Sequence, residues 1–323
     1  AKACRYTQRL GEAELHYRMV LNDDPQATVA MFDLASIIDD KGEAIELIRL
    51  GLELCSFDHQ ARCKLASLLN SVGRYNEARV ELKHVPADSP FYVDAMTQMG
   101  QSFELQGELE QAVQWLARAT LRGPHRGDVR GKYGQLLCDI GRFDDSLQEL
   151  EIAAQLEPNQ FIHWANIGLL HQHAGRSHLA IQAFQKSRAI DPGSSHVAIN
   201  LSLLLAQSGD VPAAIQLLED VLEAAPGDFK VCEILAGFHL GLHDIQQALF
   251  YSEKSIRLGN DAASIYFHLA AVFATLGNRS RCLQNLRKAI HRNPEFAERF
   301  RDEEPFAVFH DDPEFSGLAA RSE

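Results

Sequence analysis

The sequence predicts an all-α protein, a right-handed α-solenoid superhelix built from repeated helical hairpins. The chain has 323 residues, 46% of them hydrophobic and 23% charged, which suits a large core or an elongated array. A pattern of small, glycine and proline positions recurs every 34 residues, and the apolar residues between them follow helical rather than alternating spacing. Each period is therefore expected to form two helices, here called helix A and helix B.

Four columns of residues, each stepping by 34, define this repeat. Small residues expected where helix A meets helix B form two columns: Ala44, Ala78, Ala112, Ser146, Ala180, Ala214, Ala248 and Cys282, and Ala66, Gly100, Gly134, Gly168, Ser202, Ala236 and Ala270. The turn between the helices contains Gly73, Gly107, Gly141, Gly175, Gly209, His243 and Gly277. The end of helix B is marked by Pro90, Pro124, Pro158, Pro192, Pro226, Asn260 and Pro294. Short side chains permit close helix packing, glycine suits a left-handed turn residue, and proline cannot continue a helix.

This register divides the chain into four parts. We expect a partial repeat in 1–27, a shortened repeat in 28–58, seven repeats of 34 residues in 59–296, and a capping segment in 297–323. In the partial repeat, Ala1 and Cys4 are expected to end a helix A, so we expect further residues upstream, because terminal repeats of an array are normally complete. The segment 297–323 is expected to cap the last helix B, and a docked, peptide-like tail is the alternative.

The repeat resembles the tetratricopeptide repeat, whose pattern is W-x2-L-G-x2-Y followed by A, F, A and P. The unit 161–194 carries it as Trp164, Ile167, Gly168, His171, Ala180, Phe184 and Pro192. Ile167, His171 and Ser187 depart from the pattern at the positions of Leu, Tyr and the last Ala. The resemblance covers most of the chain, and it implies a largely preformed concave groove, lined by the A helices, that binds proteins.

The sequence contains no recognisable catalytic, nucleotide or metal motif. The stretch HWANIGLLHQHAG (163–175) holds three histidines, but the register places them on different helix faces. His239 and His243 have the spacing of two metal ligands, yet they fall in the tyrosine and glycine columns. We therefore predict no enzyme, no catalytic residue, no cofactor and no metal.

Charge and cysteine usage limit the classes of partner. Lys and Arg number 31 against 44 Asp and Glu, a net charge of −13, so nucleic acid is not expected to bind. A basic partner would favour 195–262, where three basic and nine acidic residues occur. No apolar run is long enough to insert into a membrane. The six cysteines are scattered without a CxxC pair, and we interpret them as buried free thiols of a cytoplasmic protein; a leader upstream of Ala1 stays an open alternative.

In the resembled family, positions 2, 5, 6, 9, 12 and 13 of helix A face the groove, and asparagines at position 6 can form a ladder that holds a peptide backbone. Position 6 here is mostly a long polar side chain or an amide, which can both donate and accept hydrogen bonds. The predicted groove residues are Lys64, Asn70, Gln98, Gln101, Lys132, Gln135, Asn166, Gln172, His173, His196, Asn200 and Gln207.

These expectations favour a non-enzymatic scaffold or adaptor that binds a peptide or protein segment in the groove. Two alternatives stay open. The chain could be the substrate-recognition arm of a larger, glycosyltransferase-like enzyme whose catalytic domain lies outside it. It could also be a structural subunit that self-associates through its terminal repeats.

Overall fold

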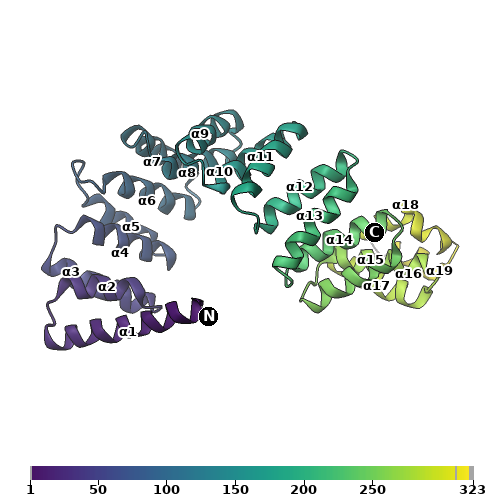
Figure 1. Cartoon of the computed structure of the whole chain (residues 1–323), viewed down its shortest axis with the longest axis horizontal. Coiled ribbons are helices and arrows are strands. Elements are labelled where there is room, and N and C mark those ends of the chain that lie inside the picture. Colours follow the sequence, from purple (N-terminus) through teal and green to yellow (C-terminus); the bar gives the residue numbers. More distant parts are fainter. Residues whose placement is uncertain (1, 310, 320–323) are drawn as a thin grey trace. The chain divides into compact units, whose positions relative to one another are not determined.

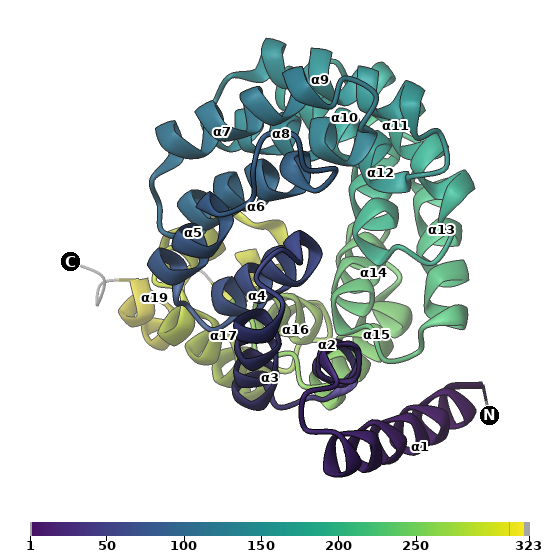
Figure 2. The same ribbon diagram turned by 90° about the vertical axis from the view of Figure 1, so that its left-hand side faces the viewer.

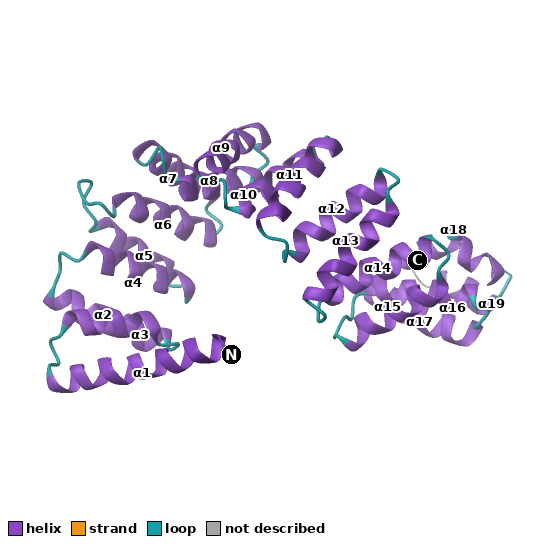
Figure 3. Cartoon of the chain, viewed as in Figure 1, coloured by secondary structure: helices purple, strands orange, loops and turns teal. Residues whose placement is uncertain are grey.

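The computed structural model describes the backbone of residues 2–309 and 311–319 and the side chains of 9–309, 311–315 and 317–318. All elements in this part of the chain are helices, and no strand occurs in it (Figure 3). The predicted all-α repeat fold is confirmed. The helices, labelled in Figure 1, are α1 (Lys2–Asp23), α2 (Thr28–Ile37), α3 (Lys41–Leu54), α4 (His59–Ser71), α5 (Tyr75–Lys83), α6 (Tyr92–Leu105), α7 (Leu109–Arg122), α8 (Gly127–Asp139), α9 (Phe143–Leu156), α10 (Phe161–His173), α11 (Ser177–Ile190), α12 (Ser195–Gln207), α13 (Val211–Ala224), α14 (Phe229–Gly241), α15 (Ile245–Arg257), α16 (Ala263–Thr275), α17 (Arg279–Arg292), α18 (Phe296–Asp302), the 3-10 helix η1 (Glu304–Phe309) and α19 (Pro313–Ala319).

The chain divides into two compact units, Ala1–Asn159 and Gln160–Glu323, and each is described by itself. Eight pairs of helices, from α2 with α3 to α16 with α17, pack as antiparallel hairpins, in which the even-numbered helix is helix A and the odd-numbered one helix B. In the first unit α6 and α8 lie on one side and α7 and α9 on the other; in the second, α12 and α13 are arranged in the same way (Figure 2). The side formed by the A helices is called the A-helix face below.

Each hairpin is held by close contact between its two helices at the small-residue columns. A methyl group added to Gly168 would lie 2.7 Å from the ring of Phe184, and one added to Gly134 would lie 2.7 Å from the side chain of Leu150. The opposing small residue is buried as well, with Ala180 at 0% exposure. Where Ser146 replaces alanine, its hydroxyl donates to the carbonyl of Gly134 at 2.6 Å, so the buried polar group is satisfied.

Three segments differ from the expected repeat. The helix α1 runs without interruption from Lys2 to Asp23, so the predicted turn between a helix A and a helix B in 1–27 is absent. In 28–58 the shortening removes the last turn of helix A, since α2 has 10 residues where most A helices have 13 or 14. The helix α5 ends at Lys83, well before the expected Pro90, because Pro86 cannot continue it. Ala1, the side chain of Cys4 and residues 320–323 lie outside the described residues.

The end of the second unit folds onto the last hairpin through aromatic side chains. The helix α18 packs on α17, and η1 packs on α16. Phe306 and Phe315 are 0% and 2% exposed, and the ring of Phe306 lies 5.4 Å from that of Phe267 on α16. The segment therefore contacts both helix A and helix B of the last hairpin.

We predict that His243→Gly stabilises the second unit. His243 is the sole residue of the turn column that is not glycine, and its φ is 57°, whereas the glycines there have φ of 68° to 94°. A left-handed backbone costs a residue with a side chain about 1–2 kcal/mol, and glycine recovers this at an entropic cost of roughly 0.5–1 kcal/mol. Denaturation in urea should show a gain of about 0.5–1 kcal/mol. The converse variant, Gly175→His, should lower stability; a loss with His243→Gly would contradict the argument.

Candidate functional site

The twelve predicted groove residues lie on the A helices, six in each unit. Five are exposed: Lys132, Gln135, His173, His196 and Gln207. Six are half-buried: Lys64, Gln98, Gln101, Asn166, Gln172 and Asn200. The remaining residue, Asn70, is buried at 9% exposure. A shared position in the repeat therefore does not give these side chains a shared environment.

A cleft between α4 and α6 in the first unit brings three of the predicted residues together. Its volume is about 300 Å³, and we call it the α4–α6 cleft. It is lined by Asn70, Gln98 and Gln101, which were predicted, and by Ser67, Ser71, Glu104 and Leu105, which were not. The missed residues occupy positions 9, 12 and 13 of helix A, so the repeat register could have identified them. Glu104 has the same position in its repeat as Asn70.

The polar groups of the α4–α6 cleft are incompletely paired. Asn70 Oδ1 and Gln98 Oε1 are buried and accept no hydrogen bond from any described residue. Ser71 is already engaged, because its hydroxyl donates to the carbonyl of Leu68 at 2.8 Å. The pKa of Glu104 is raised from its usual 4.5, first by burial and then by the negative charge of Asp139, while Lys132 opposes the shift.

Other members of the predicted ladder are engaged by the chain itself. The Asn200 amide donates to the carbonyl of His196, one turn earlier on α12, at 3.0 Å. The Lys64 ammonium lies 3.5 Å from the carbonyl oxygen of Phe32, and burial lowers the pKa of Lys64 although Asp33 opposes this. Two members of the ladder of hydrogen-bonding side chains expected from the sequence, Lys64 and Asn200, thus contact the chain itself.

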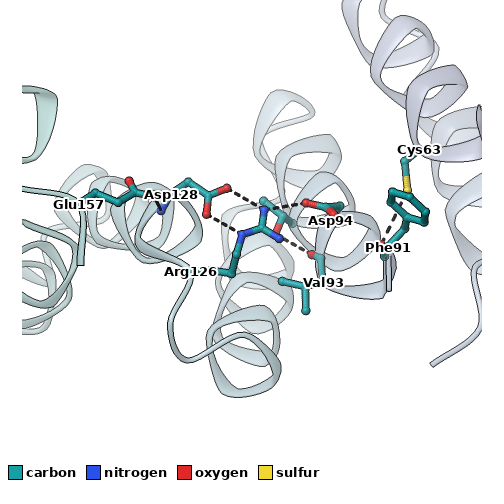
Figure 4. A network of polar contacts seen from close by, with 8 residues as sticks. Cys63, Phe91, Val93, Asp94, Arg126, Asp128 and Glu157 are labelled. Carbon is teal, nitrogen blue, oxygen red and sulfur yellow. Dashed lines mark hydrogen bonds and ion pairs between the residues drawn. The ribbon is translucent and has the colours of Figure 1, made fainter. Parts of the chain in front are cut away.

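A second polar cluster in the first unit, at the start of α6 and α8, is fully paired (Figure 4). The Arg126 guanidinium donates to Asp94 at 2.7 Å and to both oxygens of Asp128 at 2.8 Å. The Glu157 carboxylate accepts from the backbone N–H of Asp128 at 3.0 Å, and the adjacent Gly127 has no side chain to obstruct it. The cluster joins consecutive A helices, and its groups have each other as partners.

The second unit contains a larger cleft of about 600 Å³ between α14, α16 and the C-terminal segment. Its lining includes Leu240, Phe267 and Val308, and it is more apolar than polar. The Arg299 guanidinium lies 5.2 Å from the ring centre of Phe267 and donates to Glu303 at 2.8 Å. Residues from η1 thus form one wall of this cleft, opposite groove positions of the last two repeats.

The histidines of 163–175 and the pair His239 and His243 do not come together in a common site. His163 and His171 are buried, whereas His173 is exposed, as their separate helix faces require. His239 stacks on Tyr251 with ring centres 5.5 Å apart, while His243 lies in the turn. Within the described ranges no group of three or more metal-binding side chains occurs, and none of the helices described there is long and apolar enough to cross a membrane.

Comparisons with known proteins agree with the repeat register. Two models of the tetratricopeptide repeat match residues 134–195 and 173–236. Anaphase-promoting complex subunit 3 of Schizosaccharomyces pombe is 20% identical over 201 residues, 61% of this chain and 30% of that protein. Human protein O-mannosyl-transferase TMTC1 is 23% identical over 175 residues, 50% of this chain and 20% of that protein. The chain thus spans less than a third of either relative.

The solved structure of the APC/C hetero-tetramer Cut9–Hcn1 is similar in fold, with a TM-score of 0.57 and 14% identity over 97% of this chain and 59% of that one.

We predict that Glu104→Gln stabilises the fold more at pH 7 than at pH 4. A carboxyl group whose pKa is raised in the folded state binds its proton more tightly there than in the unfolded state, so the folded state loses stability as the pH rises above about 4.5. Glutamine removes this loss. Thermal denaturation should therefore show a gain in Tm at pH 7 that shrinks at pH 4, and Glu110→Gln, at an exposed position on α7, should show neither. An equal gain at both pH values would contradict the assigned cause.

Proposed function

Since this chain is a tetratricopeptide repeat protein, we propose that it is a non-enzymatic interaction scaffold that binds an extended protein segment on its A-helix face. The observation that carries the proposal is the α4–α6 cleft, where Asn70, Gln98 and Gln101 line one cavity from two helices. Amide side chains there can hydrogen-bond a peptide backbone without selecting its side chains. The hairpins are held by buried contacts, so a bound segment meets a surface that is already formed.

The C-terminal segment of this chain supports the proposal by its own position. Residues of η1 pack against α16, with Phe306 beside Phe267, which occupies groove position 5 of the last repeat. A short segment of the chain thus already lies against an A helix. We infer that the same kind of surface, where the chain leaves it uncovered, accepts a segment of another protein.

The similarity to TMTC1 favours a second candidate function, in which the repeats are the recognition arm of a larger enzyme. In that case the A-helix face would bind the segment on which the enzyme acts. Self-association through the terminal repeats is a further alternative, and α1 exposes Leu15 and Met19 by 61% and 56%.

We also propose a cytoplasmic location. The five cysteines whose side chains are described are free thiols, which suits a reducing compartment. Cys63, Cys232 and Cys282 are buried and Cys138 is half-buried, but Cys55 is exposed, contrary to the prediction that all are buried.

We predict that Gln98→Ala with Gln101→Ala weakens capture of partner proteins by roughly fivefold or more, because each lost hydrogen bond contributes about 0.5–1.5 kcal/mol. The matched control is Gln111→Ala with Gln114→Ala, which removes two exposed glutamines from α7 in the same hairpin. Quantitative pull-down with the intact chain measures the difference. Asn166→Ala with Asn200→Ala should have a smaller effect, since Asn200 bonds its own helix. Equal recovery of every partner by the glutamine variant and its control would reject binding at this face.

A further inference from the structure

The α4–α6 cleft contains hydrogen-bond acceptors that the described part of the chain does not pair. Asn70 is 9% exposed, and its Oδ1 atom lies buried without a donor. Gln98 Oε1, from the other wall of the cleft, is in the same state. Buried polar groups in folded proteins are nearly always hydrogen-bonded, and these two acceptors belong to residues that line one cleft, which leaves room beside them for a donor from outside the chain.

The third acceptor of the cleft is the half-buried carboxyl group of Glu104. It forms no ion pair with a described residue, although Lys132 and Asp139 on α8 are near enough to affect it electrostatically. These two residues carry opposite charges, and the effect of Asp139 on Glu104 is the larger of the two. A desolvated carboxylate is stabilised most by a cation that also donates hydrogen bonds.

We propose that the α4–α6 cleft binds a cationic side chain, lysine or arginine, of the protein segment held on the A-helix face. This inference rests on the proposed function and specifies the chemistry of the partner at this position. An ammonium or guanidinium group supplies between three and five N–H donors and no acceptor, which matches Asn70, Gln98 and Glu104. The aliphatic stem of such a side chain can pack on Leu105 at the rim.

The net charge of the surrounding sequence does not contradict this site. The segment 59–126 has eight basic and seven acidic residues, so long-range attraction of a basic partner is weak here and stronger towards 195–262. Long-range charge mainly sets the rate of association, whereas buried, hydrogen-bonded charges set how slowly the complex dissociates. A cationic side chain in this cleft should therefore affect the dissociation rate most.

The test is selection of a phage-displayed library of random dodecapeptides on the intact chain, followed by fluorescence anisotropy with the selected synthetic peptides. Peptides that lose affinity with Gln98→Ala and Gln101→Ala should be enriched in Lys or Arg. Glu104→Gln should weaken them roughly tenfold to a hundredfold, the range for a hydrogen bond to a charged group. Replacement of the selected lysine by norleucine should have a similar effect, and Glu110→Gln should have none.

The other outcomes separate this inference from the proposed function. Peptides that depend on Gln98 and Gln101 but not on Glu104, or that are enriched in Asp or Glu, would overturn the cationic site alone; the acidic result would mean that the amides present their NH2 groups to the cleft. A library that yields no peptide dependent on Gln98 and Gln101 would overturn both proposals. Circular dichroism of each variant confirms that it is folded.

Discussion

The close contact between the two helices of each hairpin is the constraint on which the rest of the molecule depends. At Gly100, Gly134 and Gly168 an added methyl group would lie within 2.8 Å of a side chain on helix B. The two helices are therefore too close for any side chain at these positions of helix A. Later hairpins use Ser202, Ala236 and Ala270, all at 0% exposure. This contact fixes which side of helix A is buried, and thereby which positions remain on the A-helix face for other interactions.

The two units present different chemistry at these positions. In the first unit they are mostly polar, as in the α4–α6 cleft. In the second, apolar side chains such as Leu169, Ile199 and Ile234 remain half-buried or exposed, and Phe267 of the last repeat is covered by the C-terminal segment. Apolar surface gains most by being covered, which explains why the chain places its own phenylalanines there.

The sequence predicted the hairpins well because their determinants are local. The columns of small residues and glycines locate the helix contacts and turns, and even the exception at His243 adopts the left-handed conformation of its column. The predictions failed where a local signal competed with the period: Pro86 ended α5 early, and α1 continued where a turn was expected. Docking of the tail was predicted only as an alternative to a cap on helix B, since its contacts with α16 depend on three-dimensional packing.

The candidate site was less predictable than the fold, for a physical reason. Position in the repeat tells which side of a helix a residue occupies, but not what lies opposite it about 30 residues away in sequence. Asn200 and Gln98 share position 6, yet Asn200 bonds its own helix, whereas Gln98 lines the α4–α6 cleft with its Oε1 atom unpaired among the described residues. Glu104 was overlooked because the prediction selected amide, lysine and histidine side chains, although Glu104, at position 12, lines the same cleft.

The contrast between two neighbouring polar clusters gives the α4–α6 cleft its significance. Around Arg126, where the residues are half-buried, every charge meets an opposite charge or a backbone donor, and these contacts join consecutive repeats. One hairpin earlier, Asn70 and Gln98 keep acceptors without donors, at a cost in stability of about 1–3 kcal/mol for each such group. Buried polar groups without a hydrogen-bond partner are typical of functional sites. A surface whose polar groups are already paired gains few hydrogen bonds when a partner binds.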